Sequence, residues 1–245
     1  MRQHVRIDKD GPVLALTFAR PERRNAITVA MYAALADAVE KAQDDPALRV
    51  ITIRGEGEDF TAGNDLADFL VALPREGEEI AVWRLLRALA VNQLPMVAAV
   101  HGNAIGIGTT MLLHCDVVLA EEGTRFLMPF VDLGLVPEAA SSLLLPRLAG
   151  RRRAARYLLL GEPFGPGEAA EFGLVSKVVP NGALGPALSE AVNALLAKPA
   201  EALLLTQKLV RQGTREEVLE RFELENGHFS ERLQSDEVKQ VIAAF

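Results

Sequence analysis

Short apolar runs alternate with helix-like segments over the first two-thirds of the chain. The apolar runs predict strands at residues 13–18, 50–53, 96–100, 117–120 and 175–179. Between them, apolar residues that recur every three or four positions predict helices at residues 28–42, 65–71, 80–91 and 107–113. This alternation predicts an α/β fold in which helices cover a sheet.

The pattern becomes mainly helical after Glu138. Helical spacing predicts further helices at residues 139–148, 151–160, 167–172, 187–196, 200–212 and 216–233. The last of these carries an apolar side that we expect to need a partner. We therefore predict one structural unit with two parts, a core that holds the functional site over residues 1–180 and a helical oligomerisation region over residues 181–245.

Composition excludes several classes of protein. The chain has 245 residues, 49% of them hydrophobic, and its net charge of −7 argues against a nucleic-acid partner. A single cysteine cannot form an intrachain disulfide, which fits a reducing compartment. The apolar region 94–120 is interrupted by proline, glycines and charge, and the first residues lack a secretory pattern, so we expect a cytoplasmic protein with no membrane partner.

Two glycine-bearing segments carry the strongest signal of chemistry. Residues 60–66 are FTAGNDL and residues 102–108 are GNAIGIG, and each follows a predicted strand and precedes a predicted helix. A sharp turn from strand to helix leaves backbone N–H groups without internal partners, and two such turns facing each other could bind an oxyanion. The alternative is that the glycines only permit tight turns. The spacing does not match a dinucleotide-binding fingerprint, because Met111 occupies the sixth position counted from Gly106.

Glu138 is the candidate acid–base residue. It follows Pro137 at the start of a helix of small residues, where a carboxylate can simply favour the helix dipole. Its neighbours Phe130, Val136 and Leu143 are apolar, so burial there would raise its pKa toward the range useful for proton transfer.

Taken in order along the chain, these segments resemble the crotonase, or enoyl-CoA hydratase/isomerase, superfamily. The resemblance begins with RPERRNA at residues 20–26 and continues through the two glycine segments and Cys115-Asp116. It extends to the helical C-terminal region with Phe222, Glu225, Phe229, Arg232 and Ser235. It implies a spiral of ββα units with a C-terminal helical trimerisation region. It also implies an acyl-CoA thioester substrate, no separate cofactor, since coenzyme A is part of the substrate, and a homotrimer or a dimer of trimers.

The resemblance also assigns roles to residues. The oxyanion hole would be made by the backbone N–H groups of Asn64 and Ile107, and Glu138 would be the catalytic carboxylate. Residues that would bind the substrate are Arg23, Arg24, Ala26, Ala62, Asp65, Leu66, Gly106 and Phe130. The two arginines form a charge run that is either solvated or in contact with the phosphates of coenzyme A. The four histidines have no metal-ligand spacing, so no metal site is expected.

The hydratase subgroup uses two glutamates at positions that Thr110 and Phe130 occupy here. Glu138 matches instead the acid of the peroxisomal-type Δ3,Δ2-enoyl-CoA isomerases and their bacterial relatives. The same position holds an aspartate nucleophile in aroyl-CoA dehalogenases and an aspartate base in dienoyl-CoA isomerases. We therefore predict an enzyme that shifts the double bond of a 3-enoyl-CoA to the 2-position. The alternatives are a hydratase, a dehalogenase, a dienoyl-CoA isomerase and a non-catalytic acyl-CoA binding protein.

Overall fold

The structure is a computed structural model that describes residues 4–65, 68, 80–213 and 215–243. Its strands are β1 (Val5–Asp10), β2 (Val13–Phe18), β3 (Val50–Gly55), β4 (Met96–Val100), β5 (Asn103–Ile105), β6 (Val117–Glu121), β7 (Arg125–Leu127) and β8 (Lys177–Val179). The larger sheet has the order β1-β2-β3-β4-β6-β8, and a smaller sheet pairs β5 with β7. Among the strands of the described residues, β1 and β2 pair antiparallel and the other neighbouring strands pair parallel.

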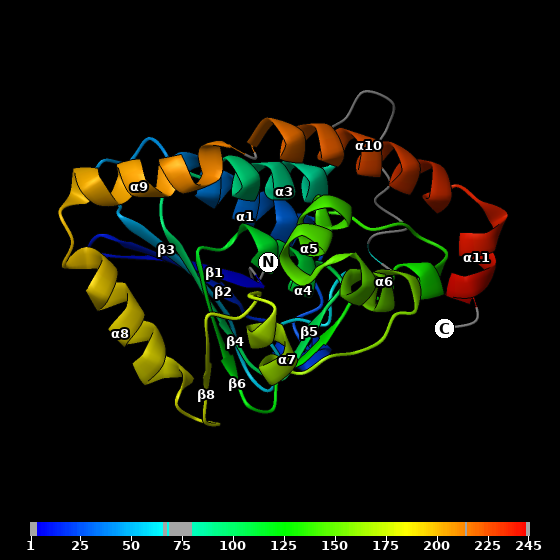
Figure 1. Cartoon of the computed structure of the whole chain (residues 1–245), viewed down its shortest axis with the longest axis horizontal. Helices are drawn as coiled ribbons and strands as arrows, with labels where there is room; N and C mark the ends of the chain where they lie inside the picture. The colour runs from blue at the N-terminus through cyan, green and yellow to red at the C-terminus, as the bar shows by residue number, and fades with distance from the viewer. Residues whose placement is uncertain (1–3, 66–67, 69–79, 214, 244–245) are drawn as a thin grey trace.

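The helices cover both faces of the larger sheet. They are α1 (Val29–Ala42), α3 (Ala81–Val91), α4 (Ile107–Thr110), α5 (Ser141–Ala149), α6 (Arg151–Leu159), α7 (Pro166–Glu171), α8 (Leu184–Leu196), α9 (Ala200–Gln212), α10 (Arg215–Leu233) and α11 (Asp236–Ala243). Short 3-10 turns are η1 (Pro21–Arg23), η2 (Met111–His114) and η3 (Val131–Leu133). In Figure 1, α9, α3 and α10 run along the top of the molecule and α8 lies apart at the lower left.

Successive turns of the chain add one strand to the larger sheet and one short extended segment to a second layer. In that second layer, Ile27 pairs with Asn64, Thr61 with Ala104, and Phe126 with Phe164. Strands β5 and β7 belong to the same layer and pair with each other: β5 contains Ala104, which pairs with Thr61, and β7 contains Phe126, which pairs with Phe164. The repetition produces the expected spiral of strand, strand and helix, and it stacks both glycine segments in neighbouring turns.

Two apolar clusters stabilise the sheet. The larger one lies between the sheet and helices α1, α3, α5 and α10, and the smaller one lies under α8 on the opposite face. The apolar side of α10 contributes Val218, Phe222, Phe229 and Leu233 to the larger cluster of the same chain. We expected this side to need another subunit as its partner, whereas these four residues are already covered within their own chain. Exposed apolar side chains are found on several elements, including Leu224 of α10 and Leu159 of α6, and three of them lie on α9, where Leu205, Leu209 and Val210 are 59%, 70% and 75% exposed.

Most of the expected elements are present, and the differences have local causes. Thr28 caps α1 as predicted, since its hydroxyl accepts a hydrogen bond from the N–H of Met31 at 3.3 Å. Helix α5 begins at Ser141 because Ala139 and Ala140 both have positive φ, which an α-helix does not permit. The expected helix over residues 107–113 is one turn of α-helix followed by η2. Part of the expected helix at 65–71 lies outside the described residues.

The apolar region 94–120 folds as expected into a buried strand, a turn, a short buried helix and a second strand. Within the described ranges, no helix combines the length and apolar character that a membrane span requires.

Candidate active site

The first glycine segment is held against the second by its backbone. The N–H of Thr61 donates to the carbonyl of Asn103 at 3.0 Å, and the N–H of Ile105 donates to the carbonyl of Thr61 at 3.0 Å. Gly63 has φ of 87°, and a Cβ added there would lie 2.8 Å from the carbonyl oxygen of Ile105. A side chain at Gly63 would therefore push the two segments apart, which explains why glycine is needed.

The second segment turns from β5 directly into α4. Gly106 has φ of 56°, and its N–H donates to the carbonyl of Leu127 at 2.8 Å. A Cβ at Gly108 would lie 2.5 Å from Cγ2 of Thr61. Because these glycines have no side chain, the two segments can lie close together, as the sequence predicted.

The N–H groups of Asn64 and Ile107 are the two donors that this arrangement offers. Where Ile27 and Asn64 pair, the hydrogen bonds use the carbonyl of Gly63 and the N–H of Asp65, so the N–H of Asn64 points away from that pairing. Ile107 is the first residue of α4, whose first N–H groups have no acceptor within the helix. Within the described part of the chain, no recorded hydrogen bond uses either N–H. Both can therefore donate to an oxygen that gains negative charge.

Glu138 lies in the loop between η3 and α5. Its side chain is 1% exposed, and within the described residues neither carboxyl oxygen has a hydrogen-bond partner. Burial raises the pKa of Glu138 to about 8, and the negative charge of Glu225 acts in the same direction. The hydroxyl of Thr110 lowers this pKa slightly, although its geometry falls short of a hydrogen bond. A carboxyl group without a partner and with a pKa near neutrality is suited to accept and return a proton.

Thr110 and Phe130 replace the two acids of the hydratase subgroup, and both are buried. Thr110 is 0% exposed and Phe130 is 4% exposed, and Phe130 packs into the larger apolar cluster. Glu138 is accordingly the single acid among these three positions.

Tyr32 is a site residue that the sequence did not suggest, because it occupies an ordinary buried position of α1. It is 0% exposed, and its hydroxyl donates a hydrogen bond to Oδ1 of Asn64. Burial and the charge of Glu138 raise the pKa of Tyr32 well above its usual value, so the phenol stays protonated. This contact fixes the side chain of Asn64, whose backbone N–H is one of the two candidate donors.

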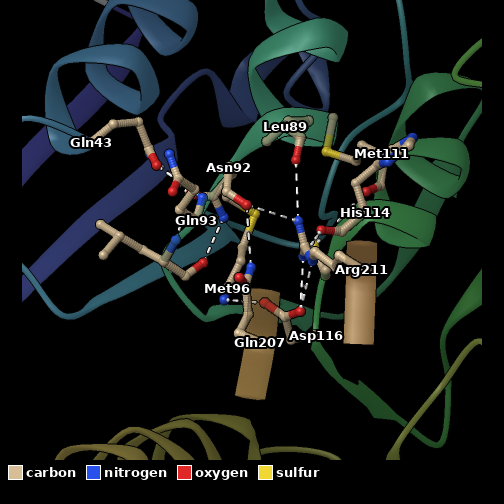
Figure 2. Close-up of polar contacts among 12 residues, drawn as sticks. Gln43, Leu89, Asn92, Gln93, Met96, Met111, His114, Asp116, Gln207 and Arg211 are labelled. Carbon is tan, nitrogen blue, oxygen red and sulfur yellow. Dashed lines mark hydrogen bonds and ion pairs between the residues drawn. The ribbon is translucent and has the colours of Figure 1, made fainter. Parts of the chain in front are cut away.

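His114 and Arg211 connect the site to α9. The Nε2–H of His114 donates to the carbonyl of Ala139 at 2.8 Å, directly after Glu138. Figure 2 shows Arg211 reaching from α9 to the carbonyl of His114, at 2.6 Å, and to Asp116. In the same view, Gln207 of α9 lies beside Asn92, to whose carbonyl it donates at 3.2 Å. Helix α9 is thereby attached to the segment that supports the turn carrying Glu138.

The basic loop that precedes α1 lies beside the first glycine segment. The carbonyl of Arg24 accepts a hydrogen bond from the N–H of Ala62 at 2.9 Å. The side chains of Arg23 and Arg24 are exposed, and Nε of Arg24 lies 4.0 Å from Asp59. Both arginines are thus accessible to an anion next to the site.

Asp65 and Ala26, two of the residues expected to bind substrate, both contact Arg20. Asp65 pairs with Arg20 at 2.6 Å, and Arg20 also donates to the carbonyl of Ala26 at 3.1 Å. Leu66, also expected to bind substrate, lies outside the described residues. The roles assigned to all of these residues stay predictions.

The chain matches the family described as enoyl-CoA hydratase/isomerase over residues 8–245. It belongs to this family. The resemblance to the crotonase superfamily is thus confirmed, and with it the fold class.

Several family members are similar over most of the chain. One is 1,2-epoxyphenylacetyl-CoA isomerase of Escherichia coli K12, which is 32% identical over 95% of this chain and 91% of its own length. Enoyl-CoA delta isomerase 2 of Rattus norvegicus is 31% identical over 87% of this chain and 56% of its own length. The crystal structure of an enoyl-CoA hydratase/isomerase from Pseudoalteromonas atlantica T6c superimposes with a TM-score of 0.94 at 39% identity, over 99% of this chain and 96% of the other.

Proposed function

We propose that the protein is an acyl-CoA enzyme that moves the double bond of a 3-enoyl-CoA to the 2-position. The observation that carries this proposal is the buried carboxyl group of Glu138, which has a pKa of about 8 and lies in the same site as two N–H groups that have no acceptor among the described residues. The family includes isomerases that act on CoA thioesters, which supports the choice of substrate.

The thioester oxygen would accept hydrogen bonds from the N–H groups of Asn64 and Ile107. Ionised Glu138 would remove a proton from C2, and the electron pair would move onto the thioester oxygen to form a dienolate. Because charge develops on that oxygen only in the transition state, the two donors bind it more tightly there than in the ground state.

Protonated Glu138 would then return the proton to C4, which conjugates the double bond with the carbonyl. The same carboxyl group serves as base and as acid, so one acid suffices. Phe130 and the apolar residues around it would exclude water from the dienolate.

Hydration needs a second carboxylate, and Thr110 and Phe130 stand where the hydratase subgroup has its acids. A non-catalytic acyl-CoA binding protein would have no use for a buried acid without partners, since burying it costs free energy. Both alternatives are therefore less well supported than isomerisation.

The test is an isomerisation assay with a 3-enoyl-CoA, comparing the wild type with Glu138→Gln. The variant should bind CoA thioesters normally and lose about 10²–10⁴-fold in kcat, the usual contribution of a general base. Glu223→Gln is the control on the surface of α10, where Glu223 is 63% exposed and pairs with Arg87. Since the base must be ionised, kcat/KM of the wild type should rise with pH until about 8. Equal activity of the wild type and Glu138→Gln would refute the proposal.

We also propose that the protein assembles through α9. The exposed apolar residues Leu205, Leu209 and Val210 of that helix would be covered in a homotrimer or a dimer of trimers. Light scattering at micromolar concentration tests this, and a monomer would refute it.

A further inference from the structure

The turn that carries Glu138 is strained. Ala139 and Ala140, the two residues that follow it, have φ of 62° and 53°. A residue with a Cβ in this left-handed region costs about 1–2 kcal/mol relative to the right-handed one. The turn therefore persists only because other contacts hold it.

Glu225 provides most of these contacts. It projects from α10, is 5% exposed, and lies 85 residues beyond Ala140 in the chain. One of its carboxylate oxygens accepts from the N–H of Ala140 at 2.7 Å. The other accepts from the N–H of Ser142 at 3.0 Å and from the hydroxyl of Ser142 at 2.5 Å. Burial raises the pKa of Glu225, whereas these contacts act in the opposite direction, because both oxygens only accept and the contacts therefore favour the ionised carboxylate. The same contacts cap the first turn of α5.

His114 also holds the turn, through a hydrogen bond to the carbonyl of Ala139. Burial lowers the pKa of His114 to about 4, so at neutral pH it contributes a hydrogen bond and no charge. Arg221 donates to the hydroxyl of Ser142 at 3.2 Å and is the cation that acts on Glu225.

The polar groups around Glu138 come from several elements. Tyr32 on α1 is a neutral phenol, and His114 on η2 is a neutral imidazole. Thr110 on α4 offers only a hydroxyl. Glu225 on α10 is accordingly the negative charge that acts on Glu138 from the described residues.

We propose that Glu225 is a positioning residue for Glu138: its carboxylate holds the strained turn in place and supplies the buried negative charge that the base faces. The proposal rests on the proposed function, because only a reaction that uses Glu138 as a base gives this positioning a purpose. When Glu138 takes a proton it loses its charge, and the repulsion from Glu225 disappears. The buried charge thereby makes Glu138 a stronger base.

The test compares Glu225→Gln with Ser142→Ala. Gln keeps the size of the side chain and removes the charge. Ser142→Ala removes the hydrogen bonds that the Ser142 hydroxyl makes with Glu225 and Arg221, and it leaves the charge of Glu225. The protonation of Glu138 is followed without substrate by the infrared band of its protonated carboxyl group, which is isolated by subtracting the spectrum of Glu138→Gln. The kcat and KM for a 3-enoyl-CoA are measured over the same pH range.

In Glu225→Gln, the titration of Glu138 and the acid limb of kcat/KM should both move to lower pH, by roughly one pH unit. The kcat should also fall on the order of tenfold with little change in KM, because the turn is less well held. Ser142→Ala should lower kcat and leave the titration where it is. Glu223→Gln, which carries the same change on the exposed side of α10, should alter neither.

A purely structural role would lower kcat in both turn variants without moving the titration, and that result would overturn the proposal. Glu225→Met is the second variant, since an apolar side chain can replace a buried ion without loss of the fold. If neither Glu225 variant folds, the electrostatic part of the proposal is overturned. If the wild type does not isomerise a 3-enoyl-CoA, the proposed function fails, whereas the infrared titration still measures the effect of Glu225.

Discussion

The burial of Glu138 predicts that this residue makes the folded state less stable as pH rises. The ordinary pKa of a glutamate is 4.5, and in the folded chain that of Glu138 is about 8. Between these values, Glu138 keeps its proton in the folded state and releases it in the unfolded state. Because the folded state binds more protons, the free energy of unfolding decreases with pH, by about 1.4 kcal/mol for each pH unit.

Glu138→Gln removes this dependence and keeps the size of the side chain. Below pH 4.5 the carboxyl group is protonated in both states, so the wild type and the variant should differ least there. From pH 4.5 to 8 the free energy of unfolding of the variant should increase relative to that of the wild type. The expected increase is on the order of 5 kcal/mol, which is the product of this pH interval and the slope. Above pH 8 the difference should stay constant.

The assay is denaturant unfolding of both proteins at a series of pH values from 4 to 9. Glu223→Gln is the matched control, since an exposed ion pair contributes about 0–1 kcal/mol and should give a small offset at every pH. Parallel curves for the wild type and Glu138→Gln would show that the carboxyl group titrates normally. That result would refute both the cost of its burial and the use of its raised pKa in catalysis.

Further predictions concern the reaction. Hydration of crotonyl-CoA should be weak or absent, because Thr110 and Phe130 stand where two acids are needed, and rates typical of a dedicated hydratase would contradict this. No covalent ester should form at Glu138 with 4-halobenzoyl-CoA, because its side chain is one methylene longer than that of aspartate and reacting atoms must approach within about 3–3.5 Å. Mass spectrometry would detect such an ester. Asn64→Ala should lose only about 1 kcal/mol of transition-state binding, roughly fivefold in kcat, because the donor is its backbone N–H. A loss as large as that of Glu138→Gln would contradict the backbone assignment.

Local signals in the sequence determined much of the fold. The cores of β2, β3, β4 and β6 are short apolar runs, and parallel strands buried on both faces have this pattern. Helix α1 shows helical spacing after a capping threonine, and the structure has both. The glycines of the two loops also identified their positions, since positive φ or a close backbone approach requires glycine at Gly63 and Gly106.

Elements with weak local signals could not be predicted. Strand β1 buries only Val5 and exposes the residues that follow it, so its sequence resembles a polar loop. Strands β5 and β7 have three residues each and exist because neighbouring turns of the spiral pair there. Short pairings of this kind depend on a partner from another part of the chain, which a local pattern does not contain.

The features of the candidate site are likewise of two kinds, those that the sequence predicted and those that depend on tertiary contacts. Glu138 could be selected from the sequence by its apolar neighbours together with its match to the acid of the isomerase subgroup. Its raised pKa also depends on Glu225, and the turn that presents it depends on Glu225 and His114. The contact of Tyr32 with Asn64 likewise joins residues from two separate segments. The sequence therefore determined the candidate base and the backbone donors, whereas tertiary packing decided their electrostatic environment, because burial and charge act through space.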